Sequence, residues 1–184
     1  MIPATVFLEH KEMALAALRK NRIYVSPDEA ASIEIADFGL SKPRVIGIQT
    51  FVLMKTDRVC LKIIVLLPHQ ICPEHKHSIL YKGEQQGKEE SLRILDGTLL
   101  FYREGPASDS PMHRVPEEYS DHFTVFRETV LSQGMKLTIE PDTWHWFQAG
   151  SDGAIIENIS TKTMDEEDLF RDPHITRIPQ IGHV

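Results

Sequence analysis

Short apolar segments rich in β-branched residues recur along most of this chain and constrain its fold more than any other feature. Residues 45–54 and 58–67 are the clearest examples, and Lys55-Thr56-Asp57 between them is a predicted turn. Similar segments follow, separated by Gly, Pro and Asp: residues 74–80, 91–95, 98–103, 124–128, 136–139, 145–149 and 154–160. Many short strands with regular turns predict an all-β core, built as a small barrel or a double-sheet jelly roll.

The first 40 residues predict helices instead of strands. Residues 7–23 carry a loose apolar stripe at helical spacing, with charged residues on the other side. A second helix is expected to begin at Ser26, with Pro27 in its first position and Glu29 completing a capping box. Gly39 is expected to end it.

The length of 184 residues suits one domain with a sizeable core. We therefore expect a single domain over residues 1–184, made of a helical extension (1–40), a barrel (41–160) and a C-terminal tail (161–184).

Charge and composition narrow the function classes. The net charge of -7, with no basic block to offset it, argues against a nucleic-acid binder. Two cysteines are too few for a disulfide framework, so we expect a cytoplasmic protein. The sequence shows neither a signal-peptide pattern nor an apolar stretch of membrane-spanning length, so no membrane partner is expected. These properties are consistent with an enzyme that acts on small molecules, but they do not require one.

Two histidines one residue apart point to a metal site. Alternate side chains of a strand share a face, so His75 and His77 can offer two imidazoles to one point. A carboxylate thirteen residues later, Glu90, can return on a neighbouring strand as a third ligand. His145 follows a turn and begins an apolar segment, which makes it the best candidate for a fourth. Such a mixed set suits a divalent ion with an open position.

Simpler interpretations exist for each part of this set. A His-x-His pair is common on exposed strands, and a histidine between two tryptophans, as His145 is, is often a packed core residue. The remaining histidines, among them His113, His122, His174 and His183, are most simply surface residues. It is the combination of a His pair, a returning Glu and a late histidine after a turn that favours a metal.

This combination resembles the cupin family. In the first cupin motif, six residues separate a metal-binding Glu from a Gly. Six residues also separate Glu90 from Gly97, so the resemblance selects Glu90, rather than Glu84 or Glu89, as the metal ligand. The second motif resembles the series Gly134, Pro141 and His145. The chain departs from the first motif in two ways: the gap between His77 and Glu90 is longer, and His69 stands where a glycine is usual before the first histidine. It departs from the second motif in two more: His145 comes one residue early after Pro141, and Ala149 stands where an asparagine is common.

Three short stretches resemble the D-lyxose isomerase branch of the cupins: residues 72–77 (CPEHKH), 87–90 (GKEE) and 145–150 (HWFQAG). The resemblance runs from about residue 35 to residue 173 and implies a cupin barrel. It also implies Mn²⁺, or another divalent ion such as Co²⁺, Fe²⁺, Ni²⁺ or Zn²⁺, and usually a homodimer. The implied reaction interconverts D-lyxose and D-xylulose, and also D-mannose and D-fructose.

Lys62 and Glu157 are the candidate catalytic residues. A metal at the carbonyl suits enediol chemistry, but the reaction also needs groups that move protons. Lys62 lies in an apolar segment, where a charge is costly unless it is used, and it resembles a family lysine thirteen residues before the first histidine. Glu157 is expected as the base. The alternatives are a snorkelling lysine and a solvent-facing carboxylate.

Other functions remain open on the sequence. A phosphosugar isomerase would need a cationic cluster, which Lys82, Lys88 and Arg93 can supply. An iron dioxygenase would consume oxygen, and a non-catalytic sugar-binding cupin would need no open metal position.

Overall fold

Two long bent strands organise the fold of the computed structural model, which describes residues 1–77, 80–81, 84–85, 87–161, 165–178 and 181. These strands, β7 (Glu90–Arg103) and β10 (His145–Thr161), pair antiparallel along nearly their whole length. The register shifts in the middle of β10, so the pair bends there and contributes to both sides of the barrel.

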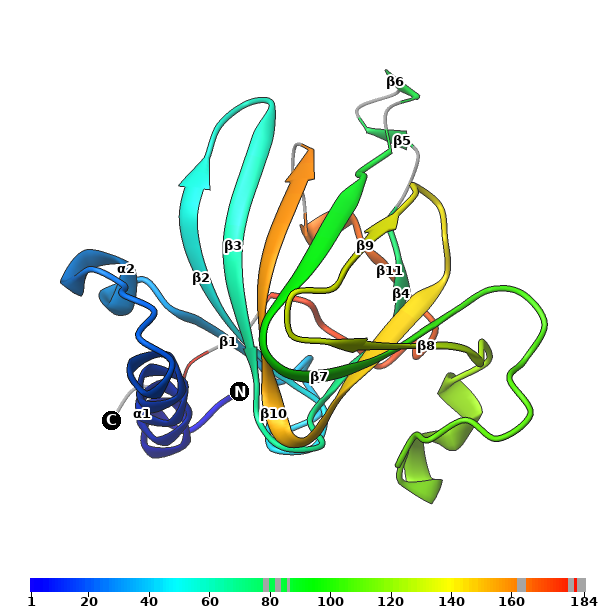
Figure 1. Ribbon diagram of the computed structural model, residues 1–184, viewed down its shortest axis with the longest axis horizontal. Coiled ribbons are helices and arrows are strands. Elements are labelled where there is room, and N and C mark those ends of the chain that lie inside the picture. The colour runs from blue at the N-terminus through cyan, green and yellow to red at the C-terminus, as the bar shows by residue number, and fades with distance from the viewer. Residues whose placement is uncertain (78–79, 82–83, 86, 162–164, 179–180, 182–184) are drawn as a thin grey trace.

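The other strands pair with the two halves of this central pair. The second half of β10 pairs with β3 (Val59–Leu66), which is followed by β2 (Ile48–Lys55) and β1 (Glu34–Ala36). The first half of β10 pairs with β4 (Ile71–Lys76), which is followed by β11 (Leu169–Phe170). β7 pairs with β9 (Lys136–Ile139) and β8 (Arg127–Ser132). The result is a sheet curled on itself, the jelly-roll architecture that the strand pattern predicts (Figure 1).

Two glycines permit the bend. Gly97 in β7 and Gly153 in β10 both have positive φ, of 78° and 82°. A Cβ atom on Gly97 would lie only 2.2 Å from the carbonyl oxygen of Gly153. Any larger residue at position 97 would push the two strands apart, which explains physically why a glycine follows Glu90 at this spacing.

The second N-terminal helix is shorter than the sequence predicts. α1 (Ala4–Lys20) and α2 (Pro27–Ala31) form, and Ser26 and Glu29 make the expected capping box. Gly39 does not end α2, because the chain has already left the helix at Ser32 and entered β1. The helical extension is thus 31 residues long at most, and residues 34–36 belong to the sheet.

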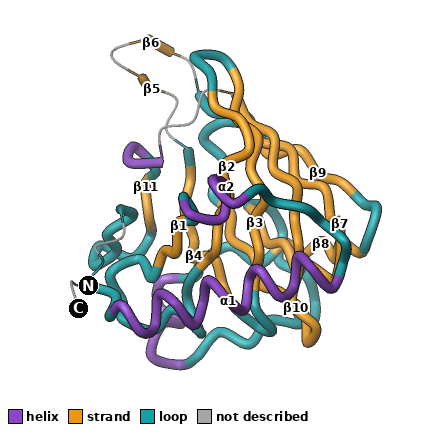
Figure 2. The backbone as a smooth tube through the Cα atoms, turned by 90° about the vertical axis from the view of Figure 1, so that its left-hand side faces the viewer, coloured by secondary structure: helices purple, strands orange, loops and turns teal. Residues whose placement is uncertain are grey.

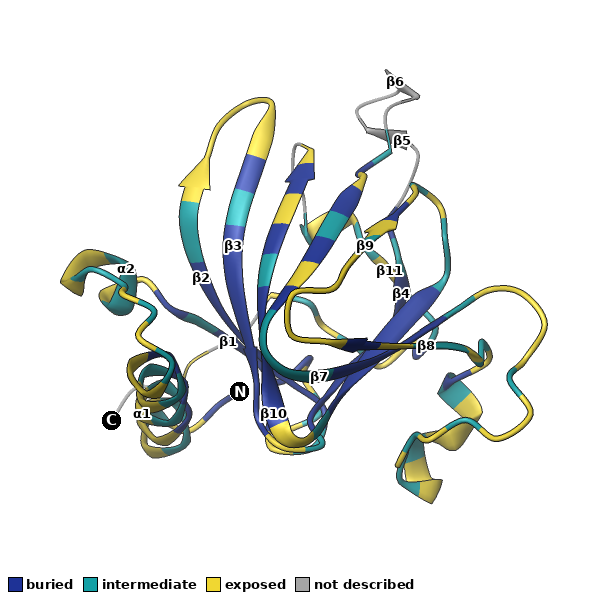
Figure 3. Cartoon of the chain, in the orientation of Figure 1, coloured by how far each residue is buried: buried dark blue, intermediate teal, exposed yellow. Residues whose placement is uncertain are grey.

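Helix α1 covers the outer face of the sheet. Its buried residues Ala14 and Leu18 pack against Phe51 of β2, Ile63 of β3 and Ile155 of β10. Figure 2 shows the helix lying across these strands, and Figure 3 shows its solvent side exposed. Because β3 is covered on both faces, it lacks a polar-apolar alternation and reads as a nearly continuous apolar run.

The remaining elements are short. They are the 3-10 helices η1 (Glu117–His122) and η2 (Asp165–Glu167) and the small hairpin of β5 (Leu80–Tyr81) and β6 (Glu84–Gln85). None of the helices in the described ranges is both long enough and apolar enough to cross a membrane.

Several predicted strand limits need correction. Residues 91–95 and 98–103 form one strand, as do residues 145–149 and 154–160, because the chain bends at its glycines without leaving the sheet. The strand expected at 124–128 begins only at Arg127, since Thr124 and Val125 instead donate backbone hydrogen bonds to Glu74. The strand expected at 74–80 begins earlier, at Ile71.

We predict that Leu18→Ala lowers the free energy of unfolding by about 2–5 kcal/mol, because it leaves a cavity between α1 and the sheet. Leu18 is 1% exposed, whereas Leu8 on the same helix is 58% exposed. Leu8→Ala is therefore the matched control, with an expected change within about 0.5 kcal/mol. Urea denaturation followed by circular dichroism measures both, and equal effects would contradict the packing described for α1.

Candidate metal centre

Three histidine side chains converge inside the barrel. His75 lies near the end of β4, His77 follows it, and His145 begins β10 directly opposite His75 in the antiparallel register. All three are buried, and one nitrogen of each lies within 4.8 Å of the other two. The alternation of β4 thus places His75 and His77 on one side as predicted, and strand pairing brings His145 to them.

Hydrogen bonds orient the three rings. Nδ1 of His75 lies 2.8 Å from the carbonyl oxygen of Pro73, and Nδ1 of His145 lies 2.8 Å from that of Thr143. Nδ1 of His77 lies 2.6 Å from Oδ1 of Asp168. Since each of these acceptors requires an N–H donor, Nε2 is the nitrogen left to bind a metal in the neutral ring.

Two of the ring nitrogens left for a metal lack hydrogen bonds. Nε2 of His145 and Nε2 of His77 are buried, and no residue in the described part of the chain forms a hydrogen bond with either, while the Glu90 carboxylate lies 3.1 Å from Nε2 of His77 as an ion-pair partner. Buried polar atoms in folded proteins are nearly always satisfied, so the unpartnered Nε2 of His145 beside the His77–Glu90 pair fits a metal ion. The residues present therefore match the chemistry of a divalent cation.

Glu90 completes the ligand set at the start of β7. Its Oε2 lies 3.1 Å from Nε2 of His77, a separation that two ligands of one ion can have, and its Oε1 accepts a hydrogen bond from Lys88 at 2.7 Å. Burial alone would raise the pKa of Glu90, but Lys88 and His77 hold this pKa well below its usual range. The carboxylate is thus ionised and able to bind a metal.

The histidines differ in protonation before a metal binds. Burial, and then the neighbouring His77, lower the pKa of His75 to about 4. Burial, with His75 and His77, also holds the pKa of His145 well below its usual value. Burial opposes the charge on His77 too, but Glu90 and Asp168 raise its pKa to about 9. A metal ion therefore has one proton to displace, at His77.

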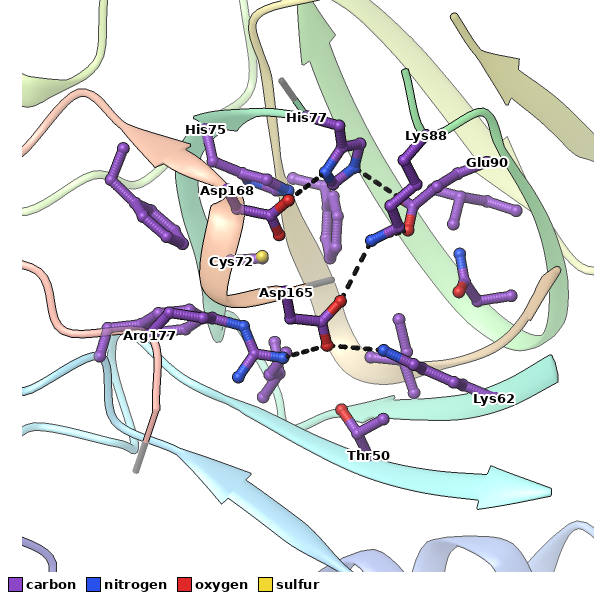
Figure 4. Close-up of a pocket in the computed structure, with 17 residues that line it drawn as sticks. Thr50, Lys62, Cys72, His75, His77, Lys88, Glu90, Asp165, Asp168 and Arg177 are labelled. Atoms are coloured by element: carbon purple, nitrogen blue, oxygen red, sulfur yellow. Dashed lines mark hydrogen bonds and ion pairs between the residues drawn. The ribbon is translucent and has the colours of Figure 1, made fainter. Parts of the chain in front are cut away.

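A network of charges faces the metal site across the pocket (Figure 4). Asp165 lies at its centre, with one oxygen 2.6 Å from Lys62 and 2.8 Å from Arg177, and the other 3.3 Å from Lys88. Burial would raise the pKa of Asp165, but Lys88, Lys62 and Arg177 hold it well below its usual range. Each buried charge thus has a partner of opposite sign, as burial requires.

The pocket between the metal site and this network has mixed walls. Apolar side chains form one part of the lining: Phe38, Ile48, Ile64, Leu92, Phe147 and Phe170. Thr50 and Asn158 line it too, and Oγ1 of Thr50 and Nδ2 of Asn158 are buried without a hydrogen-bond partner among the described residues. Such groups are suited to bind the hydroxyls of a small polar ligand.

The C-terminal segment closes one side of the site. β11 pairs with β4, placing Phe170 beside His75 with the two rings stacked and 5.5 Å between centroids. Asp168 from the same segment holds His77, and Arg171 binds the buried Glu74. Residues 165–177 are therefore part of the site rather than the separate tail that the sequence predicts.

Glu157 is the one expected site residue that lies neither in the lining of the pocket nor among the three converging histidines. It lies on the outer face of β10, 30% exposed, with its Oε2 3.5 Å from Arg93. Its neighbour Asn158 faces inward beside Lys62, its register partner on β3. Because successive side chains of a strand point to opposite faces, an inward Asn158 excludes an inward Glu157.

Of the three cations that a phosphosugar isomerase could use, the two that the structure describes do not lie together. Arg93 lies on the outer face with Glu157, and Lys88 is bound to Glu90 inside the pocket. Lys82 is outside the described residues. Phe147 lines the pocket and Trp146 packs in the core.

Sequence reasoning missed most of the polar lining. Lys88 was considered only for phosphate binding, although it lies two residues before Glu90 and so on the same side of an extended chain. Thr50 and Asn158 are polar residues beside apolar ones in their strands, which is a weak indication. Asp165, Asp168 and Arg177 lie in an acidic and mixed stretch that gives no local indication of burial.

Comparisons with known proteins point to one family. A family model described as D-lyxose isomerase matches residues 33–183. A D-lyxose ketol-isomerase from Thermofilum sp. (strain ex4484_79) is 40% identical over 181 residues, which cover 98% of this chain and 99% of that protein. A D-lyxose/D-mannose isomerase from Thermosediminibacter oceani is 41% identical over 181 residues, with the same coverage.

Solved structures share the fold at low sequence identity. L-ribose isomerase from Cellulomonas parahominis, in a structure with no ligand, has a TM-score of 0.74 and 15% identity, with 98% of each chain covered. L-ribose isomerase from Acinetobacter sp. DL28, in complex with L-ribose, also has a TM-score of 0.74, at 13% identity and the same coverage. At these identities the likeness establishes the fold, and it confirms the predicted cupin-type barrel with an N-terminal helix.

We predict that Asp168→Asn weakens Mn²⁺ binding about tenfold to a hundredfold, because the carboxylate that orients His77 and increases its basicity is lost. Titration calorimetry on chelator-treated protein measures the affinity. Asp109→Asn, an exposed position, is the matched control and should bind Mn²⁺ as the unchanged protein does. Equal affinities for the two variants would show that Asp168 does not support the metal ligand.

Proposed function

The chain belongs to the D-lyxose isomerase family, and from this premise we propose that it interconverts D-lyxose and D-xylulose with a bound divalent metal ion. The relative named D-lyxose/D-mannose isomerase supports a second pair of substrates, D-mannose and D-fructose. Each reaction is an isomerisation in which one hydrogen moves between C1 and C2, so no other reactant is consumed.

The observation that carries this proposal is the convergence of three buried histidines, with the Glu90 carboxylate 3.1 Å from one of them, beside a pocket with unsatisfied polar groups. His75, His77, His145 and Glu90 would hold the ion. A bound divalent ion supplies Lewis acidity to the carbonyl and adjacent hydroxyl oxygens of the sugar. Three neutral imidazoles and one carboxylate leave a positive charge on such an ion, and Mn²⁺ is our first choice because it accepts mixed nitrogen and oxygen ligands.

Thr50 and Asn158 are suited to hold the rest of the sugar. Their unpartnered polar atoms lie in the pocket, where a bound aldose can replace the missing hydrogen bonds with its hydroxyls. Phe147 and Phe170 offer apolar surface to the C–H groups of the same ligand. The combination favours a small polyhydroxylated molecule over an apolar one.

Lys62 and Asp165 are the residues that we propose to act on protons. Lys62 lies in the pocket, as expected, and can donate a hydrogen bond to a substrate oxygen on which negative charge develops. Of the described carboxylates lining the pocket, Glu90 faces the metal site and Asp168 holds His77, which leaves Asp165. Asp165 therefore replaces Glu157 as the candidate base. Lys88, Lys62 and Arg177 hold its pKa low, so it is ionised, as a base must be, but only weakly basic while all three cations contact it.

Two further features of the proposal can be tested in solution. One is the homodimer, which rests on the family resemblance and which light scattering can test. The other is the path of the hydrogen, for which we propose transfer of a proton through an enediol, with a hydride shift as the alternative. Turnover in heavy water separates these paths, since a hydride shift leaves no solvent label in the product.

We predict that the Mn²⁺-loaded protein converts D-lyxose to D-xylulose and, more slowly, D-mannose to D-fructose. His145→Ala should lose bound metal and about a hundredfold or more of the turnover, because the ion stabilises developing negative charge. Ketose formation followed by chromatography measures the reaction. His69→Ala removes a histidine that does not line the pocket and is the control.

Three outcomes would contradict this function. Full turnover by metal-free protein would exclude a metal-dependent isomerase. Faster conversion of phosphorylated than of free sugars would indicate a phosphosugar isomerase. Oxygen uptake with an Fe²⁺-loaded protein would indicate a dioxygenase.

We further predict that Lys62→Met lowers kcat by about 10²–10⁴-fold while Mn²⁺ content stays unchanged, because the variant loses a proton donor but no metal ligand. Lys136→Met, at an exposed strand position, is the matched control. Steady-state kinetics with metal analysis separates the two roles. A loss of metal, or a rise in KM at constant kcat, would show that Lys62 does not act in the chemical step.

A further inference from the structure

A second group of metal-binding side chains lies outside the candidate metal centre. It consists of His122, Asp172 and His174, and we call it the outer His–Asp cluster. One ligand atom of each residue lies within 4.8 Å of the other two. The cluster joins two distant segments, since His122 ends η1 and the other two residues follow β11.

The separations within the cluster fit a single ion. Oδ1 of Asp172 lies 2.9 Å from Nδ1 of His174 and 3.7 Å from Nε2 of His122. Nitrogen and oxygen ligands about 2.0–2.1 Å from a tetrahedral Zn²⁺ lie about 3.3 Å from one another. The two observed separations lie on either side of this value, so small side-chain movements would bring the three atoms into a shell around one ion.

The carboxylate of the cluster is buried, and its two histidines are progressively more exposed. The side chain of Asp172 is 7% exposed, that of His122 is 30% exposed and that of His174 is 77% exposed. His122 and Asp172 also line a small cavity whose other walls include Leu40, Ile46 and Phe123. The carboxylate thus lies in apolar surroundings, where its attraction to a cation is strong, and the outer histidine leaves a path for an ion.

The hydrogen bonds within the cluster join His174 to Asp172 but do not include His122. The backbone N–H of His174 donates to Oδ1 of Asp172 at 2.8 Å, and the ring of His174 can donate to the same atom. His122, at 3.7 Å, is too distant for a hydrogen bond to that oxygen. A cation between the three groups would bring His122 into the arrangement.

We propose that the outer His–Asp cluster binds a divalent transition-metal ion of the Zn²⁺ type through His122, Asp172 and His174, with water completing the coordination. Two imidazoles and one carboxylate are a usual ligand set for this ion. The ion ties η1 to the segment that carries Asp168, Phe170 and Arg171, which contact His77, His75 and Glu74. It therefore holds in place the wall of the candidate metal centre, and its binding does not depend on the proposed isomerase activity.

The test is the number of ions bound per chain. Chelator-treated full-length protein is titrated with Zn²⁺ and, separately, with Co²⁺, whose visible absorption reports ligation. We expect about two ions per chain for the unchanged protein and about one for each of His122→Ala and His174→Ala. His145→Ala should also bind about one, and its combination with His122→Ala none. His69→Ala, which alters a histidine of neither site, should bind about two.

Thermal denaturation supplies a second readout. In the His145→Ala background, Zn²⁺ should raise the Tm, and His122→Ala should abolish this increase. An equal number of ions in the unchanged protein and in both single histidine variants would overturn the proposal, whether that number is one or two. In that case the cluster is an arrangement of hydrogen bonds and ion pairs only. Because the variants are compared with the unchanged protein, a barrel site that binds no metal would not produce this result: the unchanged protein would then bind one ion and His122→Ala none.

Discussion

The antiparallel pairing of β4 with β10 is the constraint on which the rest of the site depends. It places His145 opposite His75 and, through the same two strands, sets where Nδ1 of each ring meets a backbone carbonyl. The rings are therefore oriented before any ion arrives, and little side-chain freedom remains to be lost when one binds. Gly97 and Gly153 allow β7 and β10 to bend together, so these two strands stay paired on both sides of the barrel.

The interior of the barrel holds a balanced set of charges that would be costly if any member were alone. Lys62, Lys88 and Arg177 meet Asp165, and Lys88 also meets Glu90. Replacement by apolar residues of similar size would serve stability at least as well, because buried ion pairs contribute little net stabilisation. The arrangement is better explained by chemistry, since charges held in a dry pocket act strongly on a ligand and need little reorganisation.

The end of the chain belongs to the functional unit. Asp168 reaches His77 across 91 positions of sequence, and Phe170 stacks on His75. The segment is held to the barrel by β11 and by the bond between Arg171 and Glu74. A substitution there can therefore change metal binding without touching a metal ligand, and the outer His–Asp cluster would add a further attachment on its far side.

By itself the sequence determined the strand-rich fold class and predicted the four candidate metal ligands, because strand alternation, turn residues and motif spacing are local properties of the chain. It also identified Lys62, since a lysine within an apolar strand is conspicuous. Only the tertiary structure decided that Asn158 rather than Glu157 faces the pocket, because β10 is apolar on both sides and its phase is set by pairing with β3. Only the tertiary structure brought Asp165 and Arg177 to the site, because their burial results from ion pairs with residues distant in sequence, and such pairs leave no periodic pattern.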